Sequence, residues 1–299
     1  MEGVIVRVDA RQCEVRHQGE VLPAAMRGRL FDKKRLDKVP VAVGDHVLVT
    51  QEGDGLAITE VLPRENLFGR CAAGDDHRRQ ILATNLDQVV HVACFGTPPF
   101  SSLTSDRILV AAEAAGIPSV LVVNKTDLDD RELATGIQRT YAAANTEVIL
   151  TSAETKQGVD ELSACLTGKQ SLLYGLSGVG KSTLLNQIDP GLDLKTREVS
   201  GALHAGRHTT TFAKMYDLAL GGTVIDTPGV RSFRPFGIPA NELRLHFPEM
   251  ALLGRQCKFS GCLHQKEPKC QVRTAHEEGD IATSRFRSYL SILQEINEA

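Results

Sequence analysis

The chain has 299 residues, of which 42% are hydrophobic, and its formal net charge is −3. This composition is ordinary for globular proteins, and the length allows about two domains. No apolar stretch approaches the ~20 residues of a membrane-spanning helix, and the N-terminal residues do not follow a signal-peptide pattern. We therefore expect a cytoplasmic protein without membrane contact, in which any nucleic-acid binding depends on local basic patches.

Residues 1–66 are predicted to form a small β-barrel. The segments GVIVRV, CEVRHQG, DHVLVTQEG and GLAITEVLP alternate or are rich in β-branched residues, and Gly, Asp or Asn interrupts them. Several short strands without a strong helix are typical of an OB-like barrel, a fold that often binds oligonucleotides. Many small β folds give the same pattern, so the barrel is a hypothesis at this point.

A basic segment, MRGRLFDKKRLDKVP, lies between two of these predicted strands. Lysine and arginine side chains in such a segment can contact the phosphates of RNA. A solvated surface loop would have the same composition, so both interpretations stay open. The candidate RNA-binding residues are Arg27, Arg29, Lys33, Lys34 and Arg35.

From about Asn85 onward, segments typical of strands and helices alternate. LDQVVHVACF, SVLVVNK, TEVILTS and SLLYG read as strands, and SDRILVAAEAAG and GVDELSACL read as helices. This alternation predicts an α/β domain with a mostly parallel sheet, to which we assign residues 67–229. Residues 230–299 lose the pattern, contain a cysteine-rich segment and end in an amphipathic helix, which predicts a third, helical and zinc-binding domain.

The segment GLSGVGKS fits the phosphate-binding pattern G-x-x-x-x-G-K-[ST], with a predicted strand before it and a helix after it. Glycines allow the backbone N–H groups to turn toward phosphate oxygens, and the helix adds its positive end. Lys181 is predicted to contact the β- and γ-phosphates, and Ser182 to ligate Mg²⁺. The nucleotide-binding residues predicted here are Gly175, Leu176, Ser177, Gly178, Val179, Gly180, Lys181, Ser182 and Thr183.

Two further motifs indicate that the base is guanine. Asn124, Lys125, Thr126 and Asp127 form the motif N-K-x-D at the end of a predicted strand. A carboxylate there accepts from both N–H groups of guanine, whereas adenine would leave it unpaired. The segment TSA, with Ser152 and Ala153, follows the next strand and matches a loop that closes over the guanine oxygen.

The remaining motifs predict the metal and γ-phosphate contacts of a GTPase. DTPG, from Asp226 to Gly229, matches D-x-x-G, whose aspartate holds Mg²⁺ through water and whose glycine senses the γ-phosphate. GRHTTT precedes it and contains the predicted Mg²⁺-covering threonine, for which Thr210 is favoured and Thr209 is the alternative. The guanine motifs precede the phosphate motif, the reverse of ordinary small GTPases. Such a permuted order is feasible because domain termini usually lie close together.

A short segment near the C-terminus has the spacing C-x₄-C-x-H-x₅-C. Three thiolates and one imidazole complete a tetrahedral zinc site with no open position, which indicates a structural metal. The alternative is a set of unpaired cysteines beside a surface histidine. The predicted ligands are Cys257, Cys262, His264 and Cys270.

The barrel, the motifs GLSGVGKS, NKTD and DTPG in permuted order, and the zinc spacing together resemble the bacterial small ribosomal subunit biogenesis GTPases, also called ribosome small-subunit-dependent GTPases. The resemblance covers nearly the whole chain. It implies an N-terminal OB-fold, GTP and GDP as ligands, and slow GTP hydrolysis that the small ribosomal subunit stimulates. It also implies a role in late maturation of that subunit and contact with its rRNA. We further expect the protein to be a monomer.

The residue that orients the attacking water is an open question. Val230 follows DTPG and cannot orient water as a glutamine does. His208, beside the switch threonines, is the catalytic candidate together with Thr210, although His208 would also suit a solvent-exposed loop. Another function considered for the whole chain is an rRNA-binding assembly scaffold in which nucleotide turnover is incidental.

Overall fold

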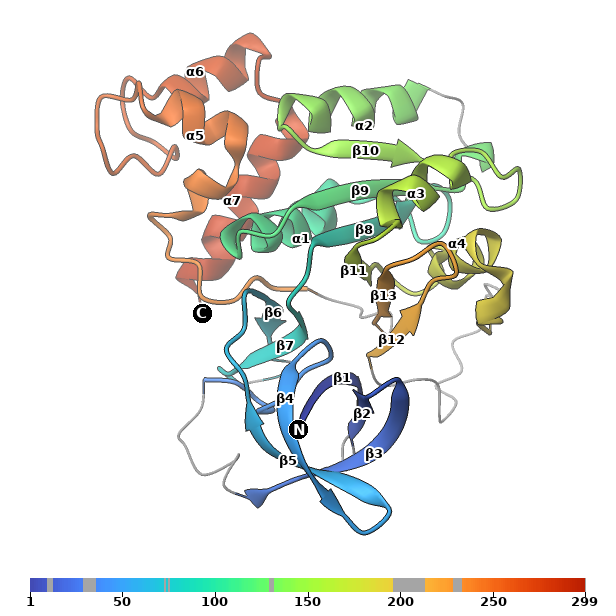
Figure 1. The fold of residues 1–299 in the computed structure, drawn as a ribbon. Coiled ribbons are helices and arrows are strands. Elements are labelled where there is room, and N and C mark those ends of the chain that lie inside the picture. Colours follow the sequence, from blue (N-terminus) through green and yellow to red (C-terminus); the bar gives the residue numbers. More distant parts are fainter. Residues whose placement is uncertain are drawn as a thin grey trace.

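The structure is a computed structural model that describes residues 1–9, 13–28, 36–72, 74, 76–128, 132–195, 213–227 and 233–298. Figure 1 shows a barrel around the N-terminus, a central α/β unit, and a helical unit at the C-terminal end. Within the described ranges, no helix combines the length and the apolar character needed to cross a membrane.

The barrel strands are β1 (Glu2–Val8), β2 (Cys13–His17), β3 (Glu20–Met26), β4 (His46–Glu52) and β5 (Gly55–Val61). A hairpin of β6 (Leu67–Cys71) and β7 (Arg79–Thr84) follows. The α/β unit contains β8 (Gln88–Cys94), α1 (Ser102–Ala114), β9 (Ser119–Asn124), η2 (Thr126–Leu128), α2 (Glu132–Ala143), β10 (Glu147–Leu150), α3 (Val159–Leu166), β11 (Gln170–Tyr174), α4 (Lys181–Ile188), η3 (Pro190–Leu192), β12 (Lys214–Asp217) and β13 (Thr223–Asp226). The C-terminal unit contains η4 (Leu243–His246), α5 (Pro248–Gly254), α6 (Gln271–Glu278) and α7 (Thr283–Asn297).

The five N-terminal strands form a closed barrel in the order β1-β2-β3-β5-β4, with β4 pairing back to β1. Alternate positions along the strands point inward, which gives an apolar interior that includes Ile5, Val15 and Ile58. Asp45, fully buried, accepts hydrogen bonds from Arg64 Nε at 2.7 Å and Thr84 Oγ1 at 2.9 Å. These bonds hold the barrel against the end of β7. The predicted OB-like barrel is confirmed.

The central sheet has the order β10-β9-β8-β11-β13-β12, and all its neighbours are parallel except β12 and β13. Leu162 and Leu184, from α3 and α4, belong to one apolar cluster of the sheet. Ile108 of α1 and Ile137 of α2 belong to two others. Strands of a parallel sheet that is covered on both faces are buried along their whole length, as β8 is. The predicted α/β GTPase fold is confirmed.

Strand β1 belongs to the barrel and to the central sheet at once. Its first residues pair with β4, whereas Arg7, near its end, pairs with Lys214 of β12. The barrel and the α/β unit therefore share one continuous sheet of eleven strands. Figure 1 shows β12 reaching from the α/β unit toward β1.

The C-terminal helices have an apolar core of their own and are joined to α1. Arg285 of α7 is 3% exposed and donates to Asp106 of α1 at 2.5 Å. The same guanidinium donates to both carboxylate oxygens of Glu249, at 2.8 and 3.1 Å. Val110 of α1 lies in the apolar cluster of the C-terminal unit. The domain boundaries 1–66, 67–229 and 230–299 stay predictions.

Candidate nucleotide site and metal centre

The loop between β11 and α4 contains the predicted phosphate-binding segment, and two of its glycines occur where a side chain would collide. A Cβ on Gly175 would lie 2.2 Å from the carbonyl oxygen of Val92. Gly180, the N-cap of α4, has φ 98°, and a Cβ there would lie 2.3 Å from Asn124 Nδ2. Helix α4 begins at Lys181, so its N-terminal end faces the loop. This geometry suits a phosphate group.

Lys181, the first residue of α4, lies close to Asp226, the last residue of β13. Lys181 Nζ donates to the Gly175 carbonyl at 2.9 Å, and burial lowers the pKa of this ammonium while nearby Asp226 opposes the shift. Burial likewise raises the pKa of Asp226, against the effect of Lys181. The Oδ1 atom of Asp226 is buried without a hydrogen-bond partner. An acceptor oxygen of this kind beside a phosphate loop fits Mg²⁺, which prefers oxygen ligands.

Asn124 connects three of the predicted motifs. Its Nδ2 donates to the Val179 carbonyl at 2.9 Å, and its Oδ1 accepts from Thr151 Oγ1 at 3.1 Å and from the Ala153 N–H at 3.3 Å. Lys125 Nζ donates to the Gly178 carbonyl at 2.7 Å. The permuted order of the motifs therefore leaves them adjacent in space.

The side chain of Asp127 is held by a neighbouring hydroxyl. Ser152 Oγ donates to Asp127 Oδ1 at 2.5 Å and itself accepts from the Thr155 N–H at 3.1 Å. Thr126 Oγ1 donates to the Thr151 carbonyl at 3.1 Å, which ties the two loops together. A carboxylate held in this way is oriented before any base arrives. Its assignment to guanine stays a prediction.

Some predicted residues fall outside the described parts of the chain. They are His208, Thr209, Thr210, Gly229, Arg29, Lys33, Lys34 and Arg35. Arg27, at the end of the described part of its segment, is exposed.

His91 was not singled out in the sequence, although it is fully buried below the phosphate loop. Its Nδ1 lies 3.2 Å from the carbonyl oxygen of Tyr174, which directly precedes Gly175, and its Nε2 lies 3.1 Å from Ser105 Oγ. Burial lowers the pKa of His91 to about 4. The residues around His91 in the sequence do not predict this contact, because it joins β8 to β11, which are far apart along the chain.

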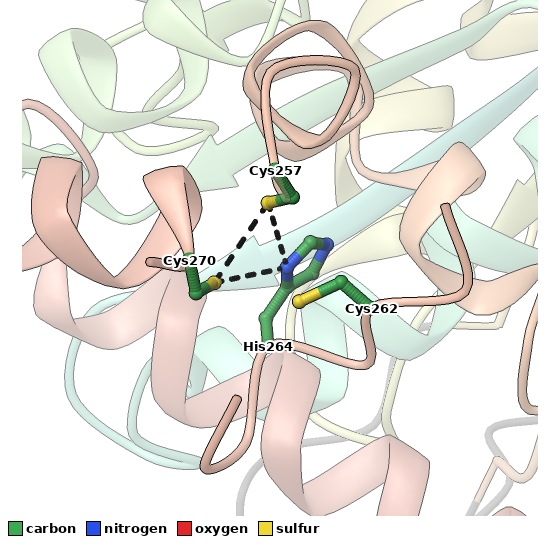
Figure 2. A group of neighbouring side chains, drawn as sticks. All are labelled: Cys257, Cys262, His264 and Cys270. Carbon is green, nitrogen blue, oxygen red and sulfur yellow. Dashed lines mark hydrogen bonds between the residues drawn. The ribbon is translucent and has the colours of Figure 1, made fainter. Parts of the chain in front are cut away.

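The four predicted zinc ligands converge at one place in the C-terminal unit (Figure 2). Their donor atoms all lie within 4.8 Å of one another. Cys257 Sγ lies 3.7 Å from His264 Nδ1 and 3.9 Å from Cys270 Sγ, and His264 Nδ1 lies 3.2 Å from Cys270 Sγ. A tetrahedral zinc with bonds of about 2.0–2.3 Å requires donor separations of this size. The donor set therefore fits zinc.

The chain around the cluster orients the ligands. His264 and Lys269 have positive φ angles of 58°, and Cys270 is the N-cap of α6. Glu267 accepts from the N–H groups of Leu263, at 2.6 Å, and Gln265, at 2.8 Å. The spacing of the cysteines and the histidine predicts which residues converge. It does not predict the role of the Glu267 carboxylate, because such a residue is not part of a zinc-binding pattern.

A phosphate loop after β11, with NKTD beginning at the last residue of β9 and DTPG at the last residue of β13 in one mostly parallel sheet, defines a circularly permuted P-loop GTPase. The family model of the RsgA GTPase matches residues 61–235. The chain is 39% identical to the small ribosomal subunit biogenesis GTPase RsgA of Gemmatimonas aurantiaca, over 98% of this chain and 97% of that protein. It is 38% identical to the RsgA of Flavobacterium johnsoniae, over 93% of this chain and 87% of that protein.

Solved structures agree with this result. The crystal structure of YjeQ from Thermotoga maritima is similar with a TM-score of 0.75 and 33% identity, over 100% of this chain and 99% of that one. That of YloQ, described as a circularly permuted GTPase, is similar with a TM-score of 0.70 and 28% identity, over 99% and 95%. The chain belongs to the RsgA GTPase family, and it is a GTP hydrolase.

Proposed function

We propose that this GTPase binds the small ribosomal subunit, assists its late maturation, and is stimulated in GTP hydrolysis by that subunit. The observation that carries the proposal is the joined nucleotide site, in which Asn124 connects the guanine motif to the phosphate loop. The relatives named for small-subunit biogenesis match nearly the whole chain, which supports the same partner here. We also propose a monomer that acts in the cytoplasm.

In this proposal the guanine base lies against Asp127, and the phosphates lie in the loop from Gly175 to Ser182. Lys181 neutralises phosphate charge, and Asp226 with Ser182 and Thr210 holds the magnesium ion. Bound Mg²⁺ supplies charge stabilisation on the transferred phosphoryl group. Cys257, Cys262, His264 and Cys270 hold one structural zinc, and the basic segment that begins at Arg27 contacts rRNA phosphates.

GTP turnover in the presence of purified small subunits, compared with turnover of GTP alone, tests the proposal. We expect a large increase, because the chain lacks a glutamine after DTPG and needs another group to orient the attacking water. His208→Ala should bind subunits with GTP but turn over slowly and accumulate as a stalled complex. Subunit binding without any stimulation would instead favour the assembly scaffold with incidental turnover.

A further inference from the structure

His91 lies at the point where strand β11 becomes the phosphate loop. It is the register partner of Tyr174, the last residue of β11, and its Nδ1 lies 3.2 Å from the Tyr174 carbonyl oxygen. The next residue of β8, Val92, also lies against the loop, because a Cβ on Gly175 would be 2.2 Å from its carbonyl oxygen. Two successive residues of β8 therefore contact the beginning of the loop, one through its side chain and one through its backbone.

The two contacts of the imidazole ring determine which of its nitrogen atoms carries the proton. A carbonyl oxygen can only accept a hydrogen bond, so Nδ1 carries the proton and donates it to Tyr174. In the neutral ring Nε2 is then an acceptor, and the Ser105 hydroxyl, 3.1 Å away, donates to it. Burial favours this neutral form and lowers the pKa of His91 to about 4. At neutral pH the ring is therefore a fixed hydrogen-bond donor to the beginning of the loop.

Two side chains of the NKTD motif hold the middle of the loop rather than its beginning. Asn124 Nδ2 donates to the Val179 carbonyl, and Lys125 Nζ donates to the Gly178 carbonyl. The packing beneath the loop is incomplete, since a cavity of about 20 Å³ lies between β8, the first turn of α1 and the loop residues Leu176 and Val179. Close-packed neighbours would resist a displacement of the loop, whereas a cavity leaves room for one. The hydrogen bond from β8 is therefore important for the position of this part of the loop.

We propose that His91 is a positioning residue of the nucleotide site: its bond to Tyr174 sets where the phosphate loop begins and thereby strengthens the binding of GDP and GTP alike. The inference rests on the phosphate-binding role proposed for the loop. The backbone N–H groups of such a loop bind a phosphate only when they converge on it, so a shift at its beginning weakens several contacts at once. The loop encloses the α- and β-phosphates, which both nucleotides contain, so the effect is the same for both.

Two substitutions in the full-length, zinc-containing protein separate the roles of the two ring nitrogen atoms. In His91→Asn the amide nitrogen can take the place of Nδ1 and donate to Tyr174, whereas in His91→Gln the amide lies farther out, where Nε2 contacts Ser105. We expect His91→Gln to raise the Kd for GDP and for a non-hydrolysable GTP analogue by about threefold or more. His91→Asn should keep both values near those of the parent, and His91→Leu, which has no donor, should behave as His91→Gln does. In steady-state turnover of GTP, His91→Gln should raise KM and leave kcat unchanged, because the lost binding is common to the ground state and the transition state.

Ser105→Ala is the matched control, since it removes the other hydrogen bond of the ring and leaves the donor to Tyr174 in place. It should lower the stability measured by urea unfolding and keep both nucleotide affinities. If His91→Gln and His91→Asn bind nucleotides equally well, or if the affinities of the variants simply follow their stabilities, His91 is only a structural residue and the inference is wrong. Lys181→Ala tests the loop itself, and parent-like nucleotide affinity in that variant would contradict the proposed function instead.

Discussion

At the scale of single residues, the site depends on groups that are fixed before any ligand arrives. Asp127 is held by Ser152, and Asn124 holds the loops on either side of it. Buried polar groups of this kind are specific because the wrong ligand leaves them unpaired. Because these residues depend on specific hydrogen-bond partners, they are also sensitive to small substitutions.

Base choice gives the first test. Asp127→Asn should shift preference from GTP toward XTP, whose additional oxygen accepts from an amide where guanine offers a donor. Competition binding of the two nucleotides measures the change. Thr126→Ser, which keeps the hydroxyl bonded to the Thr151 carbonyl, serves as the control. Unaltered selectivity for GTP over XTP in the Asn variant would mean that NKTD is not the base site.

The phosphate loop should tolerate no side chain at Gly180. Gly180→Ala combines a positive φ with a Cβ placed 2.3 Å from Asn124 Nδ2, so the loop must distort. We expect nucleotide affinity to fall by about tenfold or more, since the backbone strain alone is roughly 1–2 kcal/mol. Gly136→Ala, in an open position of α2, is the control and should slightly stabilise the fold. Parent-like affinity in Gly180→Ala would contradict the assignment of the loop.

The buried His91 should make stability depend on pH. Its pKa of about 4 in the folded protein lies below the ordinary value of 6.5. As pH falls, the unfolded chain therefore binds a proton first, and stability decreases between these two values. From pH 7.5 to 5 this contribution amounts to about 2 kcal/mol. His91→Gln cannot titrate, so urea unfolding should show a smaller loss over that interval; an equal loss would exclude His91 as the cause.

At the scale of elements, local patterns predicted the units but not the joints between them. The segment SDRILVAAEAAG was expected to be a helix ending at Gly116, and α1 ends at Ala114 with Gly116 at φ 67°. The cluster of zinc ligands followed from spacing in the same way. The pairing of β1 with β12 and the contact of His91 with Tyr174 join distant parts of the chain. Local sequence patterns do not predict such contacts, because each partner has the pattern of an ordinary strand residue in its own segment.

The zinc ion should stabilise the segment that contains its ligands and have little effect on the rest of the protein. Cys262→Ser should reduce zinc from about one ion per chain and loosen the segment between α5 and α6, because three remaining donors bind zinc less tightly. GTP affinity should remain near that of the parent, since the phosphate loop belongs to a different core. Cys165→Ser, which changes a thiol outside the cluster, is the control. Full zinc occupancy in Cys262→Ser would remove Cys262 from the ligand set.

At the scale of the whole molecule, two of the contacts that join the three parts differ in kind: a shared sheet on one side and a buried ion pair on the other. The shared sheet involves backbone pairing between Arg7 and Lys214. The ion pair of Arg285 is enclosed and has a fixed geometry. Buried side chains also hold the barrel to the core, since Val6 and Val43 lie in one apolar cluster with Leu172 and Ile225.

Breaking the buried pair should therefore affect the joint between two units. Arg285→Met leaves the carboxylates of Asp106 and Glu249 without their cation, at a loss of about 3–5 kcal/mol. We expect the C-terminal unit to melt before the α/β core in calorimetry. Arg273→Met is the control, since its partner Glu277 is mostly exposed on the same helix and the pair contributes little. A single transition at the parent temperature would show that apolar packing alone joins the units.

The position of β11 also affects how the chain folds during synthesis. All five barrel strands are complete by Val61, so the barrel can close while the rest is still being translated. The central sheet cannot be completed at that stage, because β8, β9 and β10 are synthesised first. The edge of β8 has no partner until β11 follows. Pairings between distant segments form slowly, and an unpaired apolar strand is prone to aggregation. The permuted chain thus keeps half a sheet incomplete until its phosphate-loop strand has been made.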